Sequence, residues 1–390
     1  MPYDRCRRVL LIAATAAIPA LMLPPSARAD GDPVSLPPLR LRVSAEDSCA
    51  GASDRKAERR PWTHQALQLS RSWELSRGAG VTVAVIDTGV SPRAPALTGR
   101  VDTVGAAGED CVGHGSFVAG LIAGGGEGAV TGVAPAADIL AVRGTDTRGQ
   151  ASASLVAEGI ETAVDEGADV VYVGQALAGG GKELTAAVAR ATEEDVLVVA
   201  PAVPDVAPES ADGRPDTRAR DYWPARVPEV VSVVDHGPDG GRPENAPQAL
   251  LPDLSAPGDA VVGIGPEGSG HFIGSGSSLA AAHVAGAAAL IRSYQPGLSA
   301  ADVARRLTQG AYPDHTPRLD VYSGLSAVLP TGGPAAEPEP RPARVPMAAS
   351  ARTTSRALWI GGGSLAVVLV VGAAMAVVPR GKARRWRPAE

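Results

Sequence analysis

Cysteine is scarce in this 390-residue sequence, which contains only Cys6, Cys49 and Cys111. Cys6 belongs to an N-terminal leader, described below, and is expected to leave with it. Cys49 and Cys111 are 62 residues apart (111 − 49), and no second Cys or His pair lies near them. Because that is not zinc-ligand spacing, we expect no metal and no cofactor. In an exported chain, the remaining pair most simply forms one disulfide, Cys49–Cys111.

Runs of basic residues are absent between the two ends of the chain. The formal charge of the whole sequence is −6. Residues 1–29 contribute +3 and residues 379–390 contribute +4, so the part between them carries −13 (−6 − 3 − 4). An acidic body without basic runs argues against nucleic acid and anionic lipid as partners.

The first 29 residues read as a signal peptide. Arg5, Arg7 and Arg8 precede an apolar stretch over residues 9–23, and Ala-Arg-Ala at 27–29 fits a cleavage site. The alternative is an uncleaved membrane anchor, but the apolar stretch is short and is interrupted by Pro19. Both alternatives imply export.

The C-terminal end predicts a transmembrane helix. Residues 357–378 are uncharged and rich in Val, Ala, Leu and Gly, and 22 residues suffice to cross a membrane. Five cations follow within residues 379–390, which predicts a cytoplasmic tail and an extracellular body. A buried core helix would not need such a length followed by a basic cluster. Residues 331–356 are proline-rich and predict an unfolded stalk.

The segment between these ends alternates between two kinds of pattern. Short apolar, β-branched runs occur at 81–86, 138–142, 169–173, 196–200 and 230–234, with alanine-rich helical stretches between them. Such runs are typical of a mostly parallel sheet with helices on both faces, which predicts one α/β domain over residues 61–330. Residues 30–60 are polar and are expected to wrap this domain as an N-terminal extension. In open α/β sheets the site lies at the carboxyl ends of the strands.

Three polar residues stand in contexts suited to nucleophilic catalysis. Asp87 follows the first strand, His114 lies between glycines before a helical run, and Ser278 precedes a helix of small residues. Each also has a structural interpretation, since Asp starts turns, a loop His is commonly satisfied by its neighbours, and Ser caps helices. Together, however, they provide acid, base and nucleophile in the order Asp, His, Ser, and the backbone N–H of Ser278 could serve as an oxyanion donor.

The motifs around these residues resemble those of the subtilases, serine proteases of peptidase family S8. The resemblance is carried by VAVIDTGV, GHGSFVAGLIAG and GSSLAAAHVAG, and further by VTGVAPAADILAVR and DLSAPGD. It implies a subtilisin-like fold in which Asp87 orients His114 and His114 takes the proton of Ser278. Ser278 would then attack a peptide carbonyl, so the implied substrates are proteins or peptides.

Within this superfamily the sequence resembles the mycosins, membrane-anchored proteases of type VII secretion. PWTHQALQLSRSWELSRGAGVTVAVIDTGV, the cysteine in DCVGHG with its upstream partner, and the stalk before a terminal helix carry this resemblance. It implies a type VII secretion membrane complex as a partner, with one helix in the cell membrane. The second cysteine pair of many mycosins is missing.

The sequence departs from the family pattern at the oxyanion hole. Subtilases supply an asparagine shortly after a strand such as VLVVA, but here that strand continues as PAVPD and the matching position falls at Pro204. The single asparagine of the chain is Asn245. We therefore expect weakened activity, with Ser210 or Arg214 as substitute donors. The substrate-binding strand also departs from the pattern, since it reads Gly174-Gln175-Ala176 after its apolar run instead of Ser with Leu or Gly. Milder departures are Ser277 in place of the threonine before the nucleophile and Ala282 in place of the proline after it.

Three other functions are alternatives to the protease. A pseudoprotease that binds peptides or supports a secretion complex is favoured by the missing asparagine and opposed by the retained triad. An α/β hydrolase orders its triad Ser, Asp, His and needs a second glycine after the serine, which is absent from GSSLA. A nucleotide site at GLIAGGGEG has its glycines after a helix instead of between strand and helix.

Overall fold

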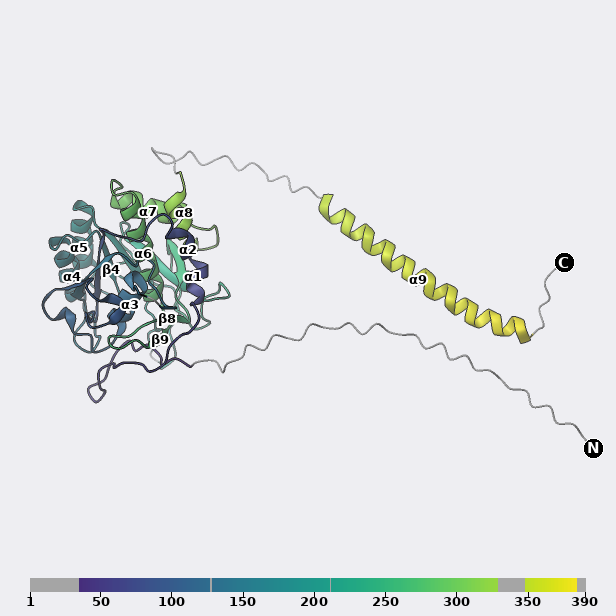
Figure 1. Ribbon diagram of the computed structural model, residues 1–390, viewed down its shortest axis with the longest axis horizontal. Helices are drawn as coiled ribbons and strands as arrows, with labels where there is room; N and C mark the ends of the chain where they lie inside the picture. The colour runs from purple at the N-terminus through teal and green to yellow at the C-terminus, as the bar shows by residue number, and fades with distance from the viewer. Residues whose placement is uncertain (1–34, 127, 211, 329–347, 384–390) are drawn as a thin grey trace, which may run out of the picture. The chain divides into compact units, whose positions relative to one another are not determined.

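A sheet of seven parallel strands forms the centre of the computed structural model, which describes residues 35–126, 128–210, 212–328 and 348–383 (Figure 1). The strand order is β2-β3-β1-β4-β5-β6-β7, and every neighbouring pair is parallel. The strands are β1 (Thr82–Asp87), β2 (Val101–Thr103), β3 (Asp138–Arg143), β4 (Val170–Val173), β5 (Leu197–Pro201), β6 (Val231–His236) and β7 (Leu254–Pro257).

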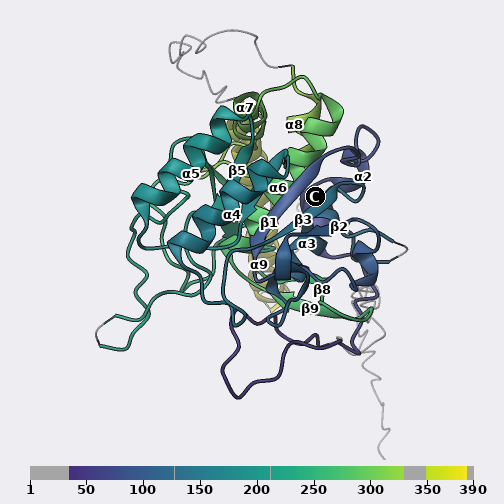
Figure 2. The same cartoon turned by 90° about the vertical axis from the view of Figure 1, so that its left-hand side faces the viewer.

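Helices cover both faces of this sheet. Helices α3 (His114–Ala123) and α6 (Ser277–Tyr294) pack on one face, and α4 (Ala153–Asp165) and α5 (Gly181–Glu193) lie side by side on the other (Figure 2). Successive residues of a strand point to opposite faces, so Val83 and Val85 join the core under α3 and α6, whereas Ala84 and Ile86 join the core under α4 and α5. The mostly parallel sheet with helices on both faces, which the sequence predicts, is confirmed.

Shorter elements complete this part of the chain. They are α1 (Trp62–Ala66), α2 (Leu69–Ser72), α7 (Ala300–Gln309), α8 (Val321–Ser326) and the 3₁₀ turns η1 (Pro95–Leu97) and η2 (Gly105–Gly108). An antiparallel hairpin of β8 (Val261–Ile264) and β9 (His271–Gly274) lies outside the main sheet. The five expected strands agree with β1, β3, β4, β5 and β6 within two residues. The remaining strands, β2, β7, β8 and β9, have three or four residues and contain polar residues or glycine, so they give no continuous apolar signal.

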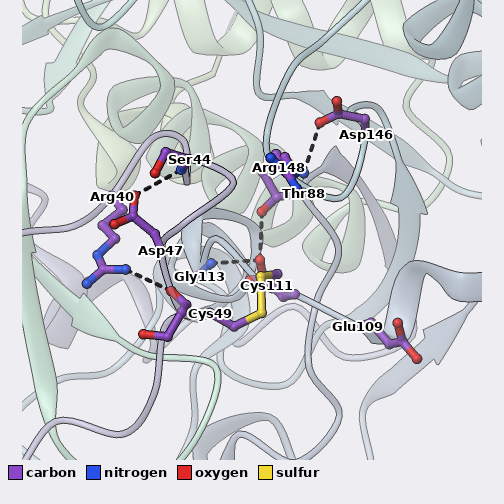
Figure 3. Close-up of a disulfide and its surroundings, with 12 residues drawn as sticks. Arg40, Ser44, Asp47, Cys49, Thr88, Glu109, Cys111, Gly113, Asp146 and Arg148 are labelled. Atoms are coloured by element: carbon purple, nitrogen blue, oxygen red, sulfur yellow. Dashed lines mark hydrogen bonds between the residues drawn. A yellow bond between two sulfur atoms is a disulfide. The ribbon is translucent and has the colours of Figure 1, made fainter.

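The extension over residues 35–60 forms neither a helix nor a regular strand and lies along the domain. Its backbone pairs with β9 through Leu39 and Ile273 (N···O 2.7 Å) and follows the loop at Arg148 through Val43 (3.1 Å). The expected disulfide is present in the structure, where Cys49 joins Cys111 (Figure 3). The extension is therefore fastened beside the start of α3.

Helix α9 (Ala348–Ala383) belongs to a second unit and is described by itself. It contains Gly361–Gly381, a 21-residue stretch with a mean hydropathy of 2.2, which is long and apolar enough to span a membrane. The helix begins nine residues before the expected boundary at 357. Residues 348–356 contain good helix formers and no proline, whereas prolines recur up to residue 346. The expected leader 1–29, most of the stalk and residues 384–390 of the tail lie outside the described residues.

Candidate active site

Asp87, His114 and Ser278 meet at the carboxyl edge of the sheet. Asp87 is the last residue of β1, His114 is the first of α3, and Ser278 is the second of α6. A parallel strand that ends here and two helices that begin here bring residues from distant parts of the chain to one place. All three side chains are buried.

The three side chains form a continuous hydrogen-bonded row. His114 Nδ1 lies 2.8 Å from Asp87 Oδ1 and 2.9 Å from Oδ2, and His114 Nε2 lies 3.1 Å from Ser278 Oγ. The backbone N–H of Thr88 donates a further bond to Asp87 Oδ1 (2.7 Å). This is the arrangement of acid, base and nucleophile that a Ser-His-Asp triad requires.

Gly174, at the end of β4, lets the Asp87 carboxylate reach its position. A Cβ atom at residue 174 would lie 1.8 Å from Asp87 Oδ2. The Asp87 carboxylate thus occupies the space that a side chain at residue 174 would take.

A fourth side chain, Asp205, lies against Ser278. Its Oδ1 accepts the backbone N–H of Ser278 (2.9 Å), and its Oδ2 accepts the Ser278 hydroxyl (2.6 Å) and lies 3.7 Å from His114 Nε2. The carboxylate packs on Gly276, where a Cβ would lie 2.2 Å from Asp205 Cγ. Asp205 therefore fills the site beside the Ser278 N–H, where a tetrahedral oxyanion would form.

Asp205 directly follows Pro204, the position near which the sequence predicts that the family asparagine is missing. β5 ends at Pro201, and the loop that follows presents Asp205, not Pro204, to the nucleophile. The sequence did contain a signal for Asp205. Aspartate has the same shape as asparagine, and Asp205 directly follows the expected position.

The two proposed substitute donors lie elsewhere. Ser210 bonds the backbone oxygen of Arg214 within its own loop (2.7 Å). The Arg214 side chain is 84% exposed and faces Asp212. Neither residue lines the cavity at the nucleophile, so the proposal that they replace the asparagine is wrong.

Two neighbouring carboxylates dominate the electrostatics of the site. Burial by itself lowers the pKa of His114, but Asp87 on one side and Asp205 on the other outweigh it and raise the pKa to about 10. Burial, together with the same two carboxylates, also raises the pKa of Tyr172 above its usual value. Tyr172 therefore stays neutral and donates its hydroxyl to the carbonyl oxygen of Ser278 (3.2 Å).

A cavity of about 500 Å³ opens beside the triad. One wall is the segment after β4, and the opposite wall is the loop after β5, which includes Asp205. Leu41 and Arg42 bring the N-terminal extension to the rim. Its lining residues are Leu41, Arg42, His114, Gln150, Ala151, Gly174, Gln175, Ala176, Leu177, Ala178, Pro201, Val203, Pro204, Asp205, Val206, Ala207, Pro208 and Tyr222. Within the described part of the chain, no three His, Cys, Asp or Glu side chains gather as metal ligands.

Comparison with known proteins agrees with this geometry. The sequence profile described as "Subtilase family" matches residues 78–325. Mycosin-3 of Mycobacterium tuberculosis is 30% identical over 96% of this chain and 94% of its own length. Thermitase of Thermoactinomyces vulgaris is 31% identical over 63% of this chain and 85% of its own.

Solved structures of mycosins are also similar to this chain. The structure of the MycP3 protease from the type VII (ESX-3) secretion system is 28% identical, with a TM-score of 0.59 over 75% of this chain and 96% of that one. MycP1 with its N-terminal propeptide removed is also 28% identical, with a TM-score of 0.57 over 70% and 99% of the two chains. The resemblance to subtilases and mycosins that the motifs indicated is confirmed.

Proposed function

Since the chain belongs to the subtilase family, we propose that it is a serine endopeptidase in which Asp87, His114 and Ser278 form the catalytic triad. The observation that carries this proposal is the unbroken row from Asp87 through both nitrogens of His114 to Ser278 Oγ. The match to the subtilase family and the similarity to the MycP3 protease support the reaction class.

Each residue has a defined role in the reaction. Asp87 bonds Nδ1 of His114, which leaves Nε2 directed at the nucleophile and stabilises the imidazolium that forms during the reaction. His114 takes the Ser278 proton while Oγ attacks the peptide carbonyl, and later gives that proton to the leaving amine. The N–H of Ser278, at the start of α6, is one donor for the oxyanion.

The cellular location of the protein is proposed from helix α9, the cations that follow it and the similarity to mycosins. The apolar part of α9 is suited to anchoring the chain in the cell membrane, and the cations after it favour a cytoplasmic C-terminus. The catalytic domain would then lie outside the cell, with the signal peptide directing export. Similarity to mycosins along nearly the whole chain supports a role beside a type VII secretion complex.

The test is labelling of the full-length protein in membranes with a fluorophosphonate, followed by identification of the labelled residue. We expect modification of Ser278, its loss in Ser278→Ala and a large decrease in His114→Ala. Hydrolysis of peptides should be measured in parallel and should be some hundreds-fold slower than in an ordinary subtilase, because the amide donor to the oxyanion is missing.

A pseudoprotease is the second candidate, and one observation favours it. The anion of Asp205 occupies the oxyanion site, where a second negative charge would be repelled. If a folded protein never reacts at Ser278, the chain acts by binding or assembly instead.

A further inference from the structure

The Ser278 hydroxyl lies between two groups that compete for its single proton. Asp205 Oδ2 is 2.6 Å from Oγ, and His114 Nε2 is 3.1 Å from Oγ on the other side. A carboxylate can only accept a hydrogen bond, so it takes the hydroxyl proton. Nε2 must then be the donor to Oγ, which makes His114 an imidazolium.

This arrangement is a resting state that cannot react. A protonated His114 has no lone pair with which to accept the Ser278 proton, and a charged Asp205 repels an oxyanion. The imidazolium instead lies between Asp87 on Nδ1 and Asp205, 3.7 Å from Nε2. Within the described residues, His114 is the one cationic group at ion-pair distance from Asp205.

The groups facing this pair come from four elements. Asp87 at the end of β1 and Asp205 after β5 are acidic, Tyr172 of β4 is neutral, and Arg42 of the extension reaches the rim of the same cavity. The two carboxylates therefore have one imidazole between them. The protonation of His114 therefore has to be considered together with both carboxylates.

We propose that Asp205 is a further catalytic residue: it accepts a proton from His114 through Ser278 Oγ and, as a neutral acid, donates a hydrogen bond to the oxyanion. This inference rests on the proposed protease function. It assigns to an aspartic acid the task that an asparagine performs in the family pattern.

The transfer needs no proton from outside. The Nε2–H proton moves to Ser278 Oγ while the original Oγ proton moves to Asp205 Oδ2, over the two contacts of 3.1 and 2.6 Å. His114 becomes neutral, the new Oγ–H points at its free Nε2, and Asp205 carries an O–H. The total charge of the site is unchanged, and the same atoms now form a competent base, nucleophile and oxyanion donor.

The geometry favours a donor at this point. Asp205 lies on Gly276 without an intervening side chain, and Oδ1 is 2.9 Å from the Ser278 N–H. When a substrate carbonyl enters, its oxygen replaces Oδ1 as the acceptor of that N–H. The adjacent Asp205 O–H then supplies the second hydrogen bond to the same oxygen.

The test compares Asp205→Asn and Asp205→Ala with wild type, all as full-length protein in membranes. Asparagine donates without a proton transfer, so Asp205→Asn should hydrolyse peptides faster than wild type. Alanine has no donor and should be slower than wild type, by about 10²-fold. Asp212→Asn, an exposed change in the same loop, should behave as wild type.

The pH dependence gives a second readout. Carboxylates raise the pKa of His114 to about 10, and wild type should lose activity as pH rises through that value, because the shared proton leaves. Asp205→Asn should keep its activity there, since its donor does not ionise. Histidine-selective NMR should also show a lower pKa for His114 in this variant.

The outcomes separate the two proposals. If Asp205→Ala is faster than wild type, or the three proteins are equal, Asp205 only obstructs or lies outside the reaction, and the inference is wrong while the protease stands. An unchanged His114 titration in Asp205→Asn also overturns it. If Ser278 reacts in none of the proteins, with Ser278→Ala as the blank, the protease function itself fails.

Discussion

The hydroxyl of Thr88 donates a hydrogen bond of 2.8 Å to the buried carboxylate of Asp110. Thr88 follows Asp87 directly, and its hydroxyl also accepts the N–H of Gly115 (2.9 Å), next to His114. Asp110 in turn accepts the N–H groups of Gly113 (2.7 Å) and Ser116 (2.8 Å). The two residues thus connect the turn after β1 to the first turn of α3, and with it the acid to the base.

Asp110→Ala should therefore destabilise the protein and slow the proposed reaction without contacting substrate. It leaves buried N–H groups unpaired, at a cost of about 3 kcal/mol in the free energy of unfolding. Because the change acts on the position of His114, kcat should fall more than KM rises. Urea unfolding and steady-state kinetics measure the two effects. The exposed Asp102→Ala on β2 is the control, and equal behaviour of the two variants would contradict the role given to Asp110.

Gly174→Ala should abolish most activity while the fold persists. The added Cβ would lie 1.8 Å from Asp87 Oδ2 and would push the carboxylate away from His114. Disturbing this acid in a serine protease triad costs about 10⁴-fold in kcat. Gly179→Ala, five residues further on, meets no atom within 4 Å and should leave the rate unchanged. Circular dichroism should show both variants folded, and full activity in Gly174→Ala would refute the argument.

The disulfide should stabilise the extension more than the sheet. Cys49 and Cys111 close a loop with a sequence separation of 62, for which loop entropy gives about 4 kcal/mol. In a Cys49→Ser, Cys111→Ser double variant, limited proteolysis should cut residues 35–60 first, with β1 to β7 still protected. Since Leu41 and Arg42 line the cavity, KM should rise as well. Simultaneous loss of protection everywhere would show that the extension is part of the core.

Acid should destabilise the protein through His283. This side chain is buried in α6, its Nδ1 lies 2.8 Å from the Pro257 carbonyl, and burial lowers its pKa to about 4. The unfolded chain takes up a proton near pH 6.5 and the folded one does not. This contribution to stability is therefore complete above pH 6.5 and decreases as pH falls to 4, by up to about 3 kcal/mol.

Denaturant unfolding between pH 7 and 4 measures this dependence. His283→Asn is the comparison, because its amide can donate to Pro257 and does not titrate. The variant should lose less stability on acidification than wild type. Parallel curves for the two proteins would place the acid sensitivity elsewhere, for example at His236, whose pKa burial also lowers to about 4.

The sequence was informative wherever the pattern depends on a long run of residues. β1, β3 and β4 are apolar runs that contain several β-branched residues, Asp87 ends the first of them, and His114 begins the helix α3. The location of a residue at the end of a strand or the start of a helix can therefore be predicted from the sequence, together with its proposed role. The fold class and the grouping of Asp87, His114 and Ser278 both followed from this.

The contact of Asp205 with Ser278 was missed because it depends on the path of an irregular loop. The sequence indicates that the loop after β5 contains Pro204 and Asp205, but not which of them faces Gly276. In an irregular loop, no periodic pattern indicates which side chain turns toward a given point. The route of the extension along β9 was equally inaccessible, since it is held by backbone hydrogen bonds that any sequence can make.

The wide separation of the triad in the chain bears on how the protein is made. Ser278 lies 164 residues beyond His114 and on the last long helix of the sheet domain. Synthesis from the N-terminus completes β1, α3 and β4 before Ser278 is added to the chain. Helix α6 packs against β4, β5, β6 and β7, so it has no position until those strands have paired. A nascent or truncated chain thus carries Asp87 and His114 without Ser278, so the proposed triad can assemble only when nearly all of the domain has been made.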